Sequence, residues 1–145
     1  TLTRSQEEYM KFYNELVHAI RDKIPVTLSE NNTKSYYLIP TGIPDVHYEW
    51  AFHGRPRSRF GVELHFETSN RETNKNLLGQ IEKSKEDIEK ETGETPIFQE
   101  NWGRTWSRLY IEKNEGKMTD ELKKWAIEKM IILYKVLQPK LDKMK

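Results

Sequence analysis

The residues from Arg59 to Glu67 alternate between polar and apolar side chains without interruption. The apolar members of this alternation are Phe60, Val62, Leu64 and Phe66. A β-strand points successive side chains to opposite faces, so the stretch predicts a central strand with one buried face and one charged face. The charged face carries Glu63 and His65, and we expect the function of the protein to lie there.

The segments around this strand predict an α+β fold. Apolar residues at helical spacing predict three main helices, over residues 3–24, 70–92 and from about 119 to the C-terminal end. Apolar runs predict strands over residues 36–39, 46–52, 59–67, 96–99 and 102–112. The order is helix, strands, helix, strands, helix, and hairpin-length connections predict a mainly antiparallel sheet of about five strands. We expect the helices to collect on one face of this sheet and to leave the other face open.

Composition restricts the classes of function. The 145 residues predict a single domain, residues 1–145, and the first residue, Thr1, suits a C-terminal fragment of a longer protein. The net charge of +1 provides no general attraction for nucleic acid or anionic membrane, so such binding needs a local patch. The absence of cysteine excludes disulfides and zinc–thiolate sites. No apolar run is long enough to span a membrane, and we expect a cytoplasmic protein.

A basic and aromatic surface is the predicted binding site. In the stretch from Trp102 to Ile111, one parity is rich in Trp and Arg, and we expect it on the same face as Glu63 and His65. Arginine and indole offer planes on which a base stacks, and a neighbouring hairpin loop supplies further arginines for phosphate. The residues predicted to contact DNA or RNA are Arg55, Arg57, Arg59, Trp102, Arg104, Trp106 and Arg108.

Three other interpretations stay open. Strand aromatics more often pack inside a protein, and strand Arg and Glu residues commonly form cross-strand ion pairs. The same aromatics also suit a protein-interaction or dimerisation module. A divergent Mg²⁺-dependent nuclease would use Asp45, Glu63 and Glu67. His65 with Glu63 and Glu67 is a weak metal set, because alternate residues of one strand do not converge well, so no metal ligand, catalytic residue or cofactor is assigned.

The order of several short motifs resembles that of a known family. The motifs are Val62-Glu63-Leu64, Asn74-Lys75, Lys85 to Glu89, Gly93, Trp102 and Arg108, followed by a long C-terminal helix. Together they resemble domain of unknown function 4268, over most of the chain. The resemblance implies a bacterial or archaeal domain, found alone or C-terminal to a restriction-nuclease-like part, with no established catalytic residues. It favours a non-catalytic accessory module that contacts nucleic acid, with a nuclease-like domain or a second copy of the chain as partner.

Overall fold

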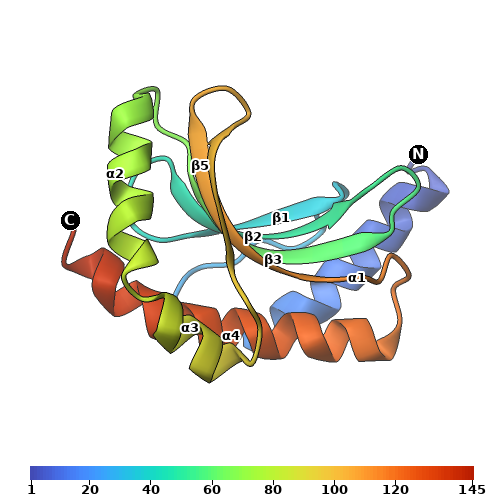
Figure 1. Cartoon of the computed structure of the whole chain (residues 1–145). Helices are drawn as coiled ribbons and strands as arrows, with labels where there is room; N and C mark the ends of the chain where they lie inside the picture. The colour runs from blue at the N-terminus through green and yellow to red at the C-terminus, as the bar shows by residue number, and fades with distance from the viewer.

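The computed structural model describes residues 1–145 and has the predicted α+β architecture (Figure 1). Its elements in chain order are α1 (Arg4–Ile20), β1 (Tyr36–Pro40), β2 (Val46–His53), β3 (Arg59–Phe66), α2 (Arg71–Glu82), α3 (Lys85–Thr92), β4 (Ile97–Trp102), β5 (Trp106–Lys113) and α4 (Asp120–Asp142). A capping box of Thr3 and Gln6 opens α1, and Gly93, with φ 72°, closes α3. None of the helices combines the length and the apolar character that crossing a membrane requires.

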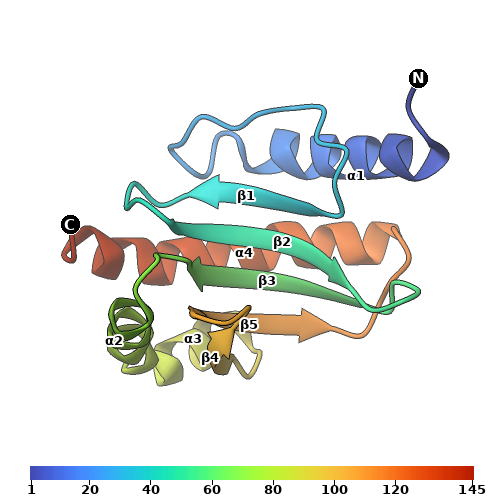
Figure 2. The same cartoon turned by 90° about the horizontal axis from the view of Figure 1, so that it is seen from above.

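The five strands form one antiparallel sheet in the order β1-β2-β3-β5-β4. The predicted strand Arg59 to Glu67 is therefore central, as β3, with hairpin partner β2 on one side and β5 on the other (Figure 2). Its register places His47 opposite His65 and Glu49 opposite Glu63 on β2, and Arg108 opposite His65 on β5. Directly opposed residues point to the same face, so polar side chains of three strands gather on one side of the sheet.

The other side of the sheet is the core. The helices α1, α3 and α4 lie below the sheet in Figure 1, whereas α2 stands beside the β4–β5 hairpin. The predicted apolar set of β3 is fully buried, together with Tyr48 and Trp50 of β2. Trp50 Nε1 donates to the carbonyl oxygen of Ala126 at 3.0 Å, and Tyr48 donates to Gln138 Oε1 at 3.0 Å. These bonds fix α4 against the sheet and leave the opposite face, which we call the open face, without a covering helix.

Three predicted boundaries are wrong. The helix predicted over 70–92 is two helices, so the fold has four helices rather than three. The break near Ser84 lets α2 pack on β5 while α3 packs on α4, which one straight helix could not do. The strand predicted over 102–112 begins only at Trp106, because Gly103 and Arg104 turn the chain with positive φ angles directly after β4 ends at Trp102. The first helix ends at Ile20 rather than Ile24.

Candidate functional site

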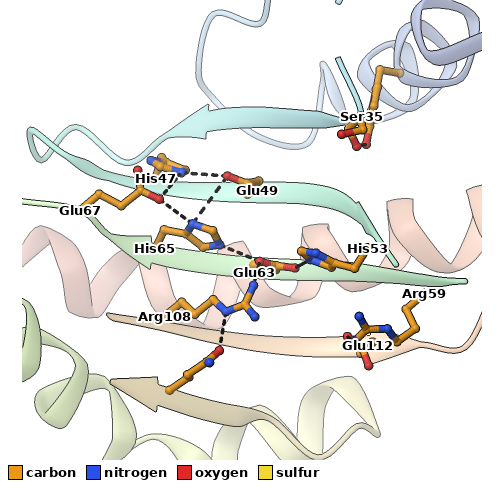
Figure 3. A network of polar contacts seen from close by, with 12 residues as sticks. Ser35, His47, Glu49, His53, Arg59, Glu63, His65, Glu67, Arg108 and Glu112 are labelled. Carbon is orange, nitrogen blue, oxygen red and sulfur yellow. Dashed lines mark hydrogen bonds and ion pairs between the residues drawn. The ribbon is translucent and has the colours of Figure 1, made fainter. Parts of the chain in front are cut away.

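Two histidines and two glutamates converge on the open face. They are His47 and Glu49 of β2, His65 of β3 and Glu67, which directly follows β3. Each offers one ligand atom, and the four atoms all lie within 4.8 Å of one another. The antiparallel register creates this convergence, because it places the two histidines side by side and brings Glu49 of β2 and Glu67 after β3 against them (Figure 3).

The distances in this cluster suit a bound metal ion. His47 Nε2 lies 3.1 Å from Glu49 Oε1 and 3.7 Å from Glu67 Oε2, and His65 Nδ1 lies 3.6 Å and 2.8 Å from the same two oxygens. A tetrahedral ion with bonds of about 2.1 Å separates its ligands by about 3.4 Å. The four donors therefore already stand close to the spacing that such an ion requires.

The buried carboxylate of Glu63 supports the cluster from beside it. Its Oε1 lies 2.6 Å from His65 Nε2 and 3.0 Å from Arg108 Nη1, and its Oε2 lies 2.6 Å from His53 Nε2 (Figure 3). Burial by itself raises the pKa of this carboxyl, but hydrogen bonds from His53 and His65 and their charges outweigh it and lower the pKa to about 2. Glu63 is therefore ionised although its side chain is inaccessible to solvent.

The imidazole of His65 lies between two carboxylates. Its Nε2 faces Glu63, and its Nδ1 faces Glu67 at 2.8 Å. Burial favours the neutral ring, but the hydrogen bonds with Glu63 and Glu67 and the charge of Glu49 raise the pKa of His65 to about 9. In the metal-free protein the ring is therefore protonated at neutral pH, and a metal ion bound at Nδ1 would replace that proton.

A hollow of about 360 Å³ lies over this cluster. The four clustered residues and His53 line it, with Tyr36 and Leu38 of β1 on one side and Trp102 and Trp106 of the β4–β5 hairpin on the other. Tyr36 and Leu38, exposed by 38% and 47%, are among the few large apolar side chains that face solvent. The hollow thus combines a polar floor with aromatic and aliphatic walls, as small-molecule sites do.

Part of the predicted nucleic-acid surface lies at this hollow. Trp102 and Trp106 are half-buried in its wall, on the predicted face. Arg108 also lies on that face, but it is 9% exposed, pairs with Glu63, and packs 4.1 Å from the Trp102 ring centroid and 4.4 Å from that of Tyr110. Its guanidinium is therefore engaged inside the protein.

The other predicted arginines lie apart from the hollow. Arg55 and Arg57 occupy the β2–β3 loop, where Arg57 stacks 5.1 Å from the ring centroids of both Tyr9 and Phe52. Arg59 pairs with Glu112 at 3.5 Å on the surface. Arg104 is exposed in the β4–β5 turn, at the other end of the sheet from the β2–β3 loop (Figure 1). Arg55, Arg57 and Arg59 therefore stay together at the β2–β3 hairpin, whereas Arg104 lies apart from them in the β4–β5 turn.

The residues proposed for a Mg²⁺ nuclease do not form one site. Asp45 is exposed, with φ 62° in the turn before β2, and it is not among the clustered ligand groups. The sequence prediction does not include His47 and Glu49, because the pattern over residues 46–52 does not by itself show which face of that strand is buried. The signal was present: once Tyr48 and Trp50 are placed in the core, the hairpin register brings the alternate polar residues of β2 against those of β3.

Comparison with known proteins gives one match. The family described as "Domain of unknown function (DUF4268)" matches residues 8–141. No curated protein and no solved structure matches the chain.

Proposed function

The chain belongs to the DUF4268 family, and we propose that this domain binds a divalent transition-metal ion on its open face. The observation that carries the proposal is the convergence of four donor atoms within 4.8 Å, from His47, Glu49, His65 and Glu67. Paired imidazole and carboxylate donors suit Zn²⁺ or Fe²⁺ better than Mg²⁺ or Ca²⁺, which prefer oxygen ligands alone.

Metal titration tests this proposal. Protein stripped with a chelator is titrated calorimetrically with Zn²⁺ and with Co²⁺, and the melting temperature is followed in parallel. We expect a single ion per chain and a rise in melting temperature, because the ion binds the folded state. His47→Ala and His65→Ala should each abolish both effects.

The matched control is His18→Ala. His18 is exposed on α1 and pairs with Glu30 at 2.8 Å, away from the open face, so its loss should leave the affinity unchanged. Absence of binding by the wild-type protein, or full binding by His47→Ala, would contradict the proposal.

A second candidate function is contact with nucleic acid, as an accessory module of a nuclease or DNA-defence protein. The observation in its favour is that Trp102 and Trp106 line the hollow while Arg104 is exposed in the turn between them. Aromatic rings of this kind stack on unpaired bases. The carboxylates of the floor repel phosphate, so we expect such binding to require the metal ion, with Arg55 and Arg57 as additional phosphate contacts.

Fluorescence anisotropy with labelled single- and double-stranded oligonucleotides tests this second function, with and without added Zn²⁺. Binding should weaken with salt and with Trp106→Ala, and Arg55→Ala/Arg57→Ala should reduce the salt dependence. If no oligonucleotide binds at low salt, a protein partner or a second copy of the chain becomes the candidate for these aromatics. Sedimentation across a concentration range then measures self-association.

A further inference from the structure

Glu63 contacts three basic side chains and is inaccessible to solvent. Both of its oxygens are occupied, Oε1 by His65 and Arg108 and Oε2 by His53. Glu63 lies on β3 between Val62 and Leu64, whose side chains face the core. Its own side chain points to the open face but is nevertheless 0% exposed. A charge in such a position is retained only when its partners hold it, so the arrangement around it is specific.

The surrounding backbone and side chains hold this carboxylate in place. A Cβ atom added to Gly61 would overlap the Glu63 carboxylate oxygen, so the missing side chain at residue 61 leaves the space into which Glu63 folds. On the other side, Arg108 donates from Nε to Gln99 Oε1 at 2.8 Å, and its guanidinium carbon lies 4.1 Å from the Trp102 ring centroid. Glu63 therefore has one preferred position.

That position decides which nitrogen of His65 faces the metal cluster. Once a metal ion has replaced the Nδ1 proton of His65, the ring donates Nε2–H to Glu63 and presents the lone pair of Nδ1 to the ion. Nδ1 lies 2.8 Å from Glu67 Oε2 and 3.6 Å from Glu49 Oε1, inside the four-donor cluster. A carboxylate behind a metal-bound histidine fixes the ring and its tautomer and increases its strength as a ligand.

We infer that Glu63 is a positioning residue for a metal ion: it binds Nε2–H of His65 so that Nδ1 is the metal ligand. The inference rests on the proposed metal site and adds to it a residue that does not itself touch the ion. It also gives the Val62-Glu63-Leu64 motif a role, since the flanking apolar residues face the core while the glutamate faces the site.

Glu63→Gln is the direct test, measured by Co²⁺ titration followed in the visible spectrum. Gln keeps the size and one acceptor but loses the charge, and we expect the affinity to fall about 10- to 100-fold. Nitrogen NMR of the Zn²⁺-bound wild type should show the proton of His65 on Nε2 and the metal on Nδ1. The variant should lose this single tautomer, a change that a merely stabilising ion pair would not cause.

Tyr48→Phe is the matched control for structural damage. It removes a buried hydrogen bond to Gln138 on the core face, so it should lower stability without changing Co²⁺ affinity or the spectrum. If Glu63→Gln binds Co²⁺ as tightly as the wild type, with an unchanged spectrum, the positioning role is wrong although the metal site stands. If the wild type binds no ion, the proposed function itself is wrong, and the inference falls with it.

Gly61→Ala is the second variant, for the case in which Glu63→Gln does not fold. It keeps every charge and every ligand but places a methyl group where the Glu63 carboxylate lies. We expect weaker Co²⁺ binding than in the wild type, in the same direction as Glu63→Gln. Gly79→Ala is its control, since the same substitution at residue 79 of α2 adds a Cβ that meets nothing within 4 Å and should leave the affinity unchanged. Equal binding by Gly61→Ala and the wild type would contradict the inference.

Discussion

The two faces of the central sheet use the same strands in different ways. On the core face, β2 and β3 bury aromatic and aliphatic side chains against α1 and α4. On the open face, alternate residues of the same strands bury charge, since Glu63 and His65 are 0% and 1% exposed although no helix covers them. Apolar burial on the core face accounts for the fold, whereas a buried ion cluster is weak evidence for stability. The difference therefore separates the face that stabilises the fold from the face on which we propose metal binding.

The sharpest test of this division compares two tryptophans, one on each face. Trp50→Ala should lower the free energy of unfolding by about 3–5 kcal/mol, because it leaves a cavity in the core and frees the carbonyl of Ala126. Trp106→Ala should cost about 1 kcal/mol, because its ring is half-exposed in the hollow. Urea unfolding monitored by circular dichroism measures both. Equal losses would mean that the open face contributes to the fold as much as the core face does.

A second comparison uses two Arg–Glu pairs between β3 and β5. Arg108→Ala removes one partner of a buried pair, and we expect a loss near the low end of about 3–5 kcal/mol, since His53 and His65 still hold Glu63. Arg59→Ala removes an exposed partner of Glu112 and should cost less than about 0.5 kcal/mol. At about 1 M salt the Debye length is only about 3 Å, so exposed ion pairs are screened. Unfolding under these conditions should reduce the stability loss caused by Arg59→Ala but not the loss caused by Arg108→Ala. A large, salt-sensitive loss at Arg59 would reverse the comparison.

The third prediction concerns pH, and it separates the ionic face from the apolar one. The pKa of Glu63 is about 2 in the folded protein and 4.5 ordinarily, so its stabilisation is complete above 4.5 and is lost as pH falls toward 2. The pKa of His65 is about 9 against an ordinary 6.5, so its stabilisation is complete below 6.5 and is lost as pH rises through 9. The metal-free protein should therefore be most stable between pH 4.5 and 6.5.

Urea midpoints across this range measure the pH dependence. Glu63→Gln should flatten both limbs, because the same carboxylate holds the His65 proton and carries the charge that acid removes. His18→Ala, whose histidine is exposed, should keep both limbs. An unchanged pH profile in Glu63→Gln would show that other groups control stability on the open face.

The same division explains what could be predicted from the sequence. Alternation on β3 identified the buried set and the charged set correctly, because the side-chain period of a strand depends on backbone geometry alone. The α+β class and the antiparallel sheet, predicted from the order of the elements and their hairpin-length connections, are also confirmed. The turn at Gly103 and Arg104 was missed because its residues continue the period of the flanking strands, so alternation alone does not reveal it.

The ligand cluster depended on information that a strand pattern does not contain. His47 and Glu49 meet His65 and Glu67 only through the register of β2 against β3, and a shift by one residue would have sent them to the core. Arg108 illustrates the same limit: its face was predicted, but its contacts with Glu63 and Trp102 depend on the pairing of β5 with β3 and β4. The separation of Arg55 from Arg104 is likewise a property of tertiary structure.

The smallest expected effects on stability are those of substitutions at two neighbouring residues of β1, one on each face of the sheet. Leu38 is 47% exposed beside the hollow, and Leu38→Ser should change the free energy of unfolding by less than about 0.5 kcal/mol. Ile39 is fully buried, and Ile39→Val should cost about 0.5–1.5 kcal/mol although it removes only one methylene. Thermal and urea unfolding of both variants measure the difference. A stability loss at Leu38 larger than at Ile39 would mean that another surface covers this edge of the open face. The predicted result would leave the exposed leucine without a structural role and therefore available to a ligand in the hollow.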